Sequence, residues 1–352
     1  MTTHRPDFEL NRPGALIAAL PAVLSFVPEN SLVLVSLDDG ELGSVMRVDL
    51  SEKLAERIGH LAEVAGAARP EAAIAVIVSA DGAHCPCCNE EYRRLCAALS
   101  EALSQHDIQL WAAHVVDRVA RGGHWHCVDG CGASGLIDDP SASPLAAAAV
   151  LDGRRLYPRR ADLQAVIAVD DPARSAELTA VVKRQALRRR AAHRADPIRC
   201  TRGDVEAAMG AASRVASGRS PSDDELASLG CALRDAEVRD ILYALAVGEN
   251  AGEVESLWAL LARTLPAPWR VEALVLLAFN AYARGDGPLA GVSLEAALRC
   301  DPDHRMAGML DIALQTGLRP EDIRELAHTG YRLAKRFGVR IPPRRPFGRR
   351  AC

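Results

Sequence analysis

The hydrophobic pattern of the chain changes near residue 170, and this change constrains the fold more than any other feature of the sequence. Before it, short apolar and β-branched stretches alternate with amphipathic helical stretches. After it, apolar residues recur at helical spacing in one segment after another up to about Phe337. Alternation is typical of a sheet packed against helices, whereas helical periodicity alone indicates a bundle. We therefore expect an α/β domain over residues 1–170 and an all-α domain over residues 201–337.

The first of these domains is predicted to hold a layered sheet. Residues 31–37 and 44–50 are apolar and β-branched and flank an Asp-Asp-Gly turn, which is typical of a hairpin. The continuous apolar run at 72–80 is typical of a strand buried on both faces, and residues 108–116 form the next strand. Because helical stretches separate the later strands, we expect a three-layer α/β domain with a mixed, largely parallel sheet.

One stretch of the helical domain has the spacing of a tetratricopeptide unit. Leu274, Ala278, Gly285-Asp286 and Pro302 fall where such a unit places its large residue, small residue, inter-helix turn and closing proline. The spacing predicts a tetratricopeptide-like helical hairpin, which would help to present a groove to a protein partner. No second unit occurs in matching register, so an antiparallel helix pair inside an ordinary bundle is the alternative.

Basic residues flank the helical domain on both sides. Residues 171–200 predict a basic connecting helix, and residues 338–352, rich in Arg, Pro and Gly, predict a disordered tail. Nucleic-acid binding through Lys183–Arg202 and this tail is one interpretation, since such segments can meet phosphate. A solvated basic face is the other, because arginine is used throughout the chain.

The sequence predicts no contact with a membrane. The apolar run from Ala15 to Leu37 is broken by Pro21, Pro28 and Glu29 before it reaches the ~20 residues that a spanning helix needs. A basic segment followed by an apolar core and a small-residue cleavage site is also missing from the start. We therefore expect a cytoplasmic protein whose thiols are reduced or bound to metal.

Five of the ten cysteines crowd into residues 84–88 and 124–131, together with three histidines. Gly122-Gly123 should turn the chain so that residues 124–128 run antiparallel beside the strand at 108–116. This places His124 and His126 near the sheet edge where the 84–88 loop leaves its strand. A regular strand moves about 3.3 Å per residue, so Cys131 should lie about 20 Å from that edge.

Two chemistries fit this crowding. Zinc takes four nitrogen or sulfur ligands, and Cys85, Cys88, His124 and His126 are the predicted set. Alternatively, Cys85-x-x-Cys88 precedes a helix capped by Asn89, whose amides would lower a thiol pKa and favour redox chemistry. Thiols that merely sit in a loop are the third interpretation.

The same edge offers a further candidate ligand site. Asp81 and His84 follow a strand that we expect to be parallel to its neighbour, at the edge where α/β proteins bind ligands. His114 lies on a strand between apolar neighbours, which favours a buried histidine over a general base. Nucleotide-binding loops and the common hydrolase motifs are missing from the sequence.

Four further stretches of the sequence are distinctive. They are residues 12–35, beginning Arg-Pro-Gly-Ala-Leu-Ile, then Arg47-Val-Asp-Leu, Val238-Arg-Asp and Gly285-Asp-Gly-Pro-Leu-Ala. Together they resemble landmarks of a large actinobacterial family, the domain of unknown function 4192, from about Arg12 to Leu326. The resemblance implies an actinobacterial cytoplasmic protein and carries over no activity or catalytic residue. The aromatic and cysteine-containing stretch of that family corresponds here to residues 121–127, and its cysteine pair is reduced to Cys131-Gly132.

These observations favour a non-enzymatic interaction or scaffold protein whose helical half binds a protein partner. An enzyme, or a thiol or metal sensor, at the carboxyl edge of the sheet is the first alternative. Nucleic-acid binding is the second.

Overall fold

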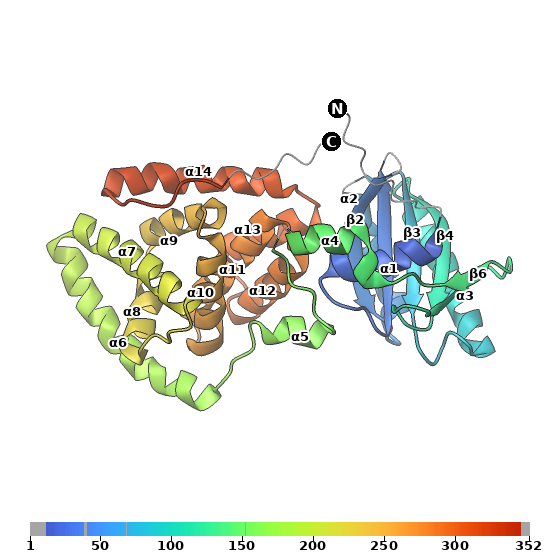
Figure 1. The fold of residues 1–352 in the computed structure, drawn as a ribbon, viewed down its shortest axis with the longest axis horizontal. Coiled ribbons are helices and arrows are strands. Elements are labelled where there is room, and N and C mark those ends of the chain that lie inside the picture. The colour runs from blue at the N-terminus through green and yellow to red at the C-terminus, as the bar shows by residue number, and fades with distance from the viewer. Residues whose placement is uncertain (1–11, 39–40, 68, 152, 346–352) are drawn as a thin grey trace. The chain divides into compact units, whose positions relative to one another are not determined.

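The computed structural model describes residues 12–38, 41–67, 69–151 and 153–345. The chain forms two compact units. The first extends to Leu163 and includes Gln315–Gly317, and the second takes in the remaining residues from Gln164 onward. Figure 1 shows strands in the first unit and helices throughout the second. Among the described residues, no helix has both the length and the apolar character needed to cross a membrane.

The first unit contains a mixed sheet of six strands in the order β2-β1-β3-β4-β5-β6. Only β3 and β4 are parallel, while every other neighbouring pair is antiparallel. The strands are β1 (Ser31–Asp38), β2 (Glu41–Asp49), β3 (Ala72–Val78), β4 (Gln109–Val116), β5 (His124–Cys127) and β6 (Ser134–Leu136). The predicted mixed sheet is confirmed, and the prediction that it is largely parallel is wrong.

The position of β1 explains this difference. β1 lies between β2 and β3 and is antiparallel to both, so β2 and β3 run in the same direction without touching. The helix α2 (Leu54–Ala67) therefore crosses over β1, whereas α3 (Pro86–Ser104) joins the adjacent parallel strands β3 and β4. A crossover helix indicates that two strands share a direction, but it does not make them neighbours.

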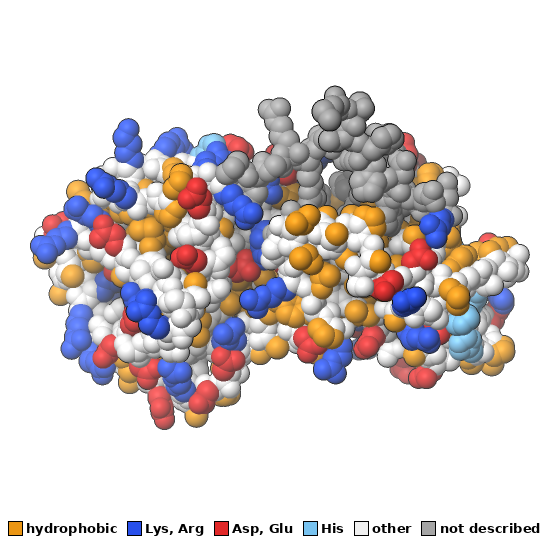
Figure 2. Space-filling view, in the orientation of Figure 1, with side chains coloured by type: hydrophobic (Ala, Val, Ile, Leu, Met, Phe, Trp, Pro, Cys, Tyr) orange, Lys and Arg blue, Asp and Glu red, His pale blue; other side chains and the backbone are white. Residues whose placement is uncertain are grey.

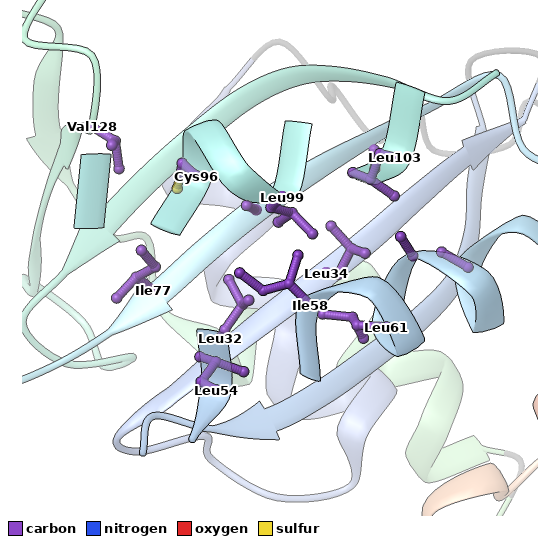
Figure 3. Packing of buried hydrophobic residues seen from close by; sticks show 14 of the residues in the cluster. Leu32, Leu34, Leu54, Ile58, Leu61, Ile77, Cys96, Leu99, Leu103 and Val128 are labelled. Atoms are coloured by element: carbon purple, nitrogen blue, oxygen red, sulfur yellow. The ribbon is translucent and has the colours of Figure 1, made fainter. Parts of the chain in front are cut away.

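Both crossover helices pack on one face of the sheet. Ile58 and Leu61 of α2 and Leu99 and Leu103 of α3 meet apolar side chains of the strands, including Ile77 (Figure 3). A core of this kind contributes about 25 cal/mol per Å² of apolar surface that it removes from water.

The opposite face is buried as well. Val33 and Val35 of β1 point to this side, and neither is exposed. The helix α1 (Pro13–Leu24), which crosses the sheet in Figure 1, packs against α4 (Pro144–Leu151). A Cβ atom on Gly14 would lie 2.3 Å from the carbonyl oxygen of Leu136, so the start of α1 approaches β6 as closely as only glycine permits. Helices on both faces give the expected three layers.

Helices make up the second unit. Within it, α11 and α12 form an adjacent pair joined at Gly285, which takes the left-handed conformation. The α-helices are α6 (Pro172–Ala195), α7 (Pro197–Ala216), α8 (Asp223–Ala232), α9 (Ala236–Leu242), α10 (Ala251–Thr264), α11 (Arg270–Arg284), α12 (Gly287–Cys300), α13 (Arg305–Gln315) and α14 (Pro320–Phe337). A short 3-10 helix, η2 (Tyr243–Val247), follows α9, while η1 (Pro140–Ala142) and α5 (Arg160–Ala165) precede α6.

Two predicted segments differ from the structure. The helix expected to connect the domains, α6, packs against α7 and α8 as part of the second unit. Residues 338–345, expected to begin a disordered tail, are held by hydrogen bonds instead. Tyr331 donates to the carbonyl of Pro342, Glu249 to that of Pro343, and Arg345 to that of Val247. The rest of the predicted tail, residues 346–352, lies outside the described residues.

Candidate thiol site at the carboxyl end of β3

The loop after β3 is fixed by a small network of hydroxyl groups. Because β3 and β4 are parallel, the loops that follow them leave the same edge of the sheet. Ser79, the first residue after β3, accepts hydrogen bonds from the Gly82 amide at 3.1 Å and from the Tyr92 hydroxyl at 2.9 Å. Tyr92 belongs to α3, so this network ties the start of the loop to the helix that follows it.

Cys85 occupies the N-cap position of α3, with an extended backbone (φ −90°, ψ 118°), and Pro86 begins the helix. The proline fixes the cap, because proline lacks an amide hydrogen and its φ suits the first helical position. Asn89, expected from the sequence to be the cap, lies in the first turn instead. Cys85 thus lies immediately before the first turn of α3, and Cys88, three residues further on, lies within that turn.

The two thiols have opposite pKa shifts. The amide of Cys88 is the largest cause of the lowered pKa of Cys85, and the Cys88 thiol is the second. The neutral Cys85 thiol makes no capping hydrogen bond. The amide and thiol of Cys88 therefore lower the pKa of Cys85 by stabilising its ionised form, the thiolate. The pKa of Cys88 is raised, first by its hydrogen bond to Cys85 and then by burial. Cys85 is therefore the thiol that ionises first.

Asn89 bridges this loop to β5. Its amide nitrogen donates to the carbonyl of Ala83 at 3.1 Å and to that of Cys85 at 3.0 Å. Its side-chain oxygen lies 2.8 Å from Nε2 of His126, so His126 donates when that nitrogen carries the proton. Burial is the largest cause of the lowered pKa of His126, followed by the charges of His84 and Arg93. A largely neutral imidazole thus faces the loop that carries Cys85.

The structure does not gather the four zinc ligands predicted from the sequence. Within the described ranges, no three of Cys85, Cys88, His124 and His126 have ligand atoms that all lie within 4.8 Å of one another. His126 is held by Asn89, and His124 is an exposed residue whose backbone amide donates to Asp117. A zinc site on these four residues stays a prediction that requires movement of the loop.

Asp81 and His84, predicted at the ligand edge, are both exposed in the loop between β3 and α3. His84 is close enough to His126 for its charge to affect the pKa of His126. A ligand at this edge stays a prediction.

The structure does assemble a different group, which the sequence reasoning missed. The ligand atoms of Cys127, Asp129 and Cys131 all lie within 4.8 Å of one another, and they form the only such group among the described residues. The strand β5 ends at Cys127, and the chain then turns back into β6. The extended-strand geometry that separated Cys131 from the 84–88 loop therefore does not continue past Cys127. The Asp-Gly pair at 129–130 was the available signal for this turn.

His114 lies beside this turn. It is opposite Cys127 across the β4–β5 pair, and its ring stacks edge-on against Trp125 with 5.1 Å between centroids. The residue is 6% exposed, and Nδ1 has no hydrogen-bond partner in the structure. Burial lowers the pKa of His114 to about 4, so the ring is neutral near neutral pH. It is a buried histidine as expected, but its Nδ1 has none of the hydrogen bonds that a buried group usually makes.

Comparison with known proteins identifies a family and nothing finer. A family model described as Domain of unknown function (DUF4192) matches residues 13–321. Neither the curated proteins nor the solved structures contain a match to the chain.

Proposed function

We propose that this chain, which belongs to the DUF4192 family, uses Cys85 and Cys88 as a redox-active dithiol. The observation that carries the proposal is the position of Cys85 at the N-cap of α3 with Cys88 in the first turn. With a rise of about 1.5 Å per residue on a cylinder of about 2.3 Å radius, helical residues three apart have Cα atoms about 5 Å apart. Disulfides join residues whose Cα atoms are about 4.4–6.8 Å apart. The two cysteines are therefore placed to form a disulfide with little movement of the backbone.

The chemistry is thiol-disulfide exchange with a disulfide substrate. The Cys85 thiolate attacks one sulfur of the substrate, forms a mixed disulfide and releases the other substrate sulfur as a thiolate, which takes up a proton. Cys88 loses its proton and attacks the sulfur of Cys85, which releases the second substrate thiolate. The substrate disulfide is reduced by two electrons, and the dithiol is oxidised to the Cys85–Cys88 disulfide. The opposite pKa shifts support Cys85 as the attacking thiol and Cys88 as the resolving thiol.

The test is oxidation of the reduced, full-length protein by oxidised glutathione, followed by peptide mass mapping. We expect the wild-type protein to form the Cys85–Cys88 disulfide, and Cys88→Ser to stop with one glutathionyl group on Cys85. Cys85→Ser should form neither product at this site. The matched control is Cys131→Ser, which removes an exposed thiol from a different loop and should leave the reaction unchanged. Glutathionylation spread evenly over the exposed thiols, without a Cys85–Cys88 disulfide, would contradict the proposal.

The interaction role predicted for the helical half remains a second proposal with less support. The adjacent helices α11 and α12 are compatible with a tetratricopeptide-like hairpin. The second unit also has an open hollow of about 530 Å³ whose lining residues all carry polar groups. Its lining residues are Glu325, His328, Thr329, Tyr331, Arg332 and Arg344.

Nucleic-acid binding through the basic segment has the weakest support of the three. Arg189 pairs with Asp204 and Asp235 at 2.7 Å each, and Arg184 pairs with Asp224 at 3.2 Å. On the face of the second unit drawn in Figure 2, basic and acidic side chains are interspersed. Arginines that are already neutralised by carboxylates contribute little to phosphate binding.

A further inference from the structure

We infer that Cys127, Asp129 and Cys131 bind one thiophilic divalent cation, with Zn²⁺ the preferred ion. The site lies in the turn between β5 and β6 and shares no residue with the dithiol proposed above. The three ligand atoms lie within 4.8 Å of one another. In a tetrahedral zinc site with bonds of about 2.0–2.3 Å, ligand atoms are about 3.5–3.8 Å apart. Small adjustments of three side chains are therefore enough to bring these atoms to coordinating distance.

The backbone that carries the three ligands is held at both ends of the turn. The Cys127 amide donates to the carbonyl of Ala133 at 2.9 Å, and the Cys131 amide donates to the Asp129 carboxylate at 3.0 Å. Gly130 and Gly132 have φ values of +74° and +85°, which glycine adopts without strain and which let the chain turn back on itself. A ligand set held by its own backbone loses little conformational freedom when the metal binds.

Two contacts anchor Val128, which lies between the first two ligands. Its amide donates to the carbonyl of Ala113 in β4 at 2.9 Å, and its carbonyl accepts from Nε of Arg93 in α3 at 3.1 Å. A Cβ atom added to Gly130 would lie 3.5 Å from a terminal nitrogen of Arg93, so the guanidinium also borders the site. The turn is thus fixed to both the sheet and the helix.

The ligand chemistry selects the ion. Two thiolates and one carboxylate favour zinc over magnesium and calcium, which prefer oxygen ligands. Binding displaces the two thiol protons, so the ligands carry three negative charges and the complex with Zn²⁺ carries one. The guanidinium of Arg93, which also pairs with Glu90 at 2.9 Å, borders the site and offsets part of this charge.

His114 supplies an independent observation, which is a buried ring nitrogen without a hydrogen-bond partner beside the proposed site. It lies opposite Cys127, is 6% exposed, and has no hydrogen-bond partner for Nδ1. Residues directly opposite each other on antiparallel strands point to the same face, so the His114 ring is next to the Cys127 side chain. Three protein ligands leave the fourth position of a tetrahedral zinc ion to water. A hydrogen bond from that water to Nδ1 would satisfy the buried nitrogen.

The test is titration of the reduced, metal-free, full-length protein with Zn²⁺ against a chromophoric chelator. Substitution with Co²⁺ reports thiolate ligation through its charge-transfer absorption. We expect one ion per chain and two thiolate ligands. Cys127→Ser and Cys131→Ser should each weaken binding at least tenfold, and Asp129→Asn should do the same without disturbing the fold, because Asp129 is exposed.

Cys85→Ser and Cys88→Ser are the matched controls, because each removes one thiol of the other cluster and should leave Zn²⁺ affinity unchanged. Zinc binding that survives Cys127→Ser and Cys131→Ser would overturn the inference. Loss of zinc only in the Cys85 and Cys88 variants would also overturn it and would move the ion to the set predicted from the sequence. The zinc result and the oxidation result can fail separately. Cys131→Ser should lose zinc and still form the Cys85–Cys88 disulfide.

Discussion

Cys85 is expected to react with iodoacetamide near neutral pH several-fold faster than any other described cysteine of the native chain. The thiolate is the reacting form, and the pKa of Cys85 is lowered by the amide and thiol of Cys88. The buried thiols provide the contrast, because desolvation raises the pKa of Cys96 to about 12 and that of Cys231 to about 11. Timed alkylation followed by peptide mapping measures each rate.

The lowered pKa of Cys85 also predicts how its alkylation rate depends on pH. A lowered pKa keeps the Cys85 thiolate populated at pH values where an ordinary thiol is protonated, so its rate should fall only at lower pH. Cys88→Ala removes the thiol donor and leaves the backbone amide, so we expect the pKa of Cys85 to rise part of the way back and the rate near neutral pH to fall. Cys87→Ser is the matched control, because it changes a neighbouring exposed side chain and keeps every amide.

Two outcomes would count against the assigned role of Cys85. One is a rate profile that inflects where an unperturbed thiol does, at about pH 8.5. The other is a rate for Cys85 that does not change when the protein is unfolded in denaturant, since the donors of α3 are then lost. Either result would mean that the N-cap position does not activate the thiol.

The strands and helices were largely predictable because their signals are local. The hairpin of β1 and β2, the buried strand β3, and the return of β5 beside β4 follow from apolar runs and turn residues. The pairing of β1 with β3 depends on contacts between distant residues, which local periodicity does not encode. That is why the sheet was expected to be more parallel than it is.

In the candidate sites too, features set by local sequence were predictable and contacts between distant residues were not. Cys85-x-x-Cys88 before a helix was visible in the sequence, and Pro86 was the better signal for where that helix begins. The bridge from Asn89 to His126 was not visible, because it joins residues 37 positions apart. In this arrangement Nε2 of His126 faces the side chain of Asn89.

Replacement of Glu272 is expected to destabilise the helical unit by about 3 kcal/mol, because removing one partner from a buried charge network leaves the others unpaired. The Glu272 carboxylate is 8% exposed, pairs with Arg239 at 2.5 Å, and lies 3.2 Å from Nε2 of His304. Glu272→Gln keeps the shape of the side chain and removes its charge. Denaturant unfolding followed by circular dichroism measures the loss. As a control, Glu295→Gln breaks an exposed pair with Arg299 one helix away and should cost less than about 1 kcal/mol.

The same network determines how the contribution of Glu272 to stability depends on pH. Burial alone would raise the pKa of Glu272, but the hydrogen bond from His304 and the charge of Arg239 outweigh it, and the pKa is lowered. A carboxyl group with a lowered folded-state pKa stabilises the protein above its unfolded pKa of about 4.3. That stabilisation is lost as the pH falls through the folded-state value. The difference in stability between wild type and Glu272→Gln should therefore shrink once the pH falls below about 4.3. A difference that persists there would mean that Glu272 contributes through packing and not through its charge.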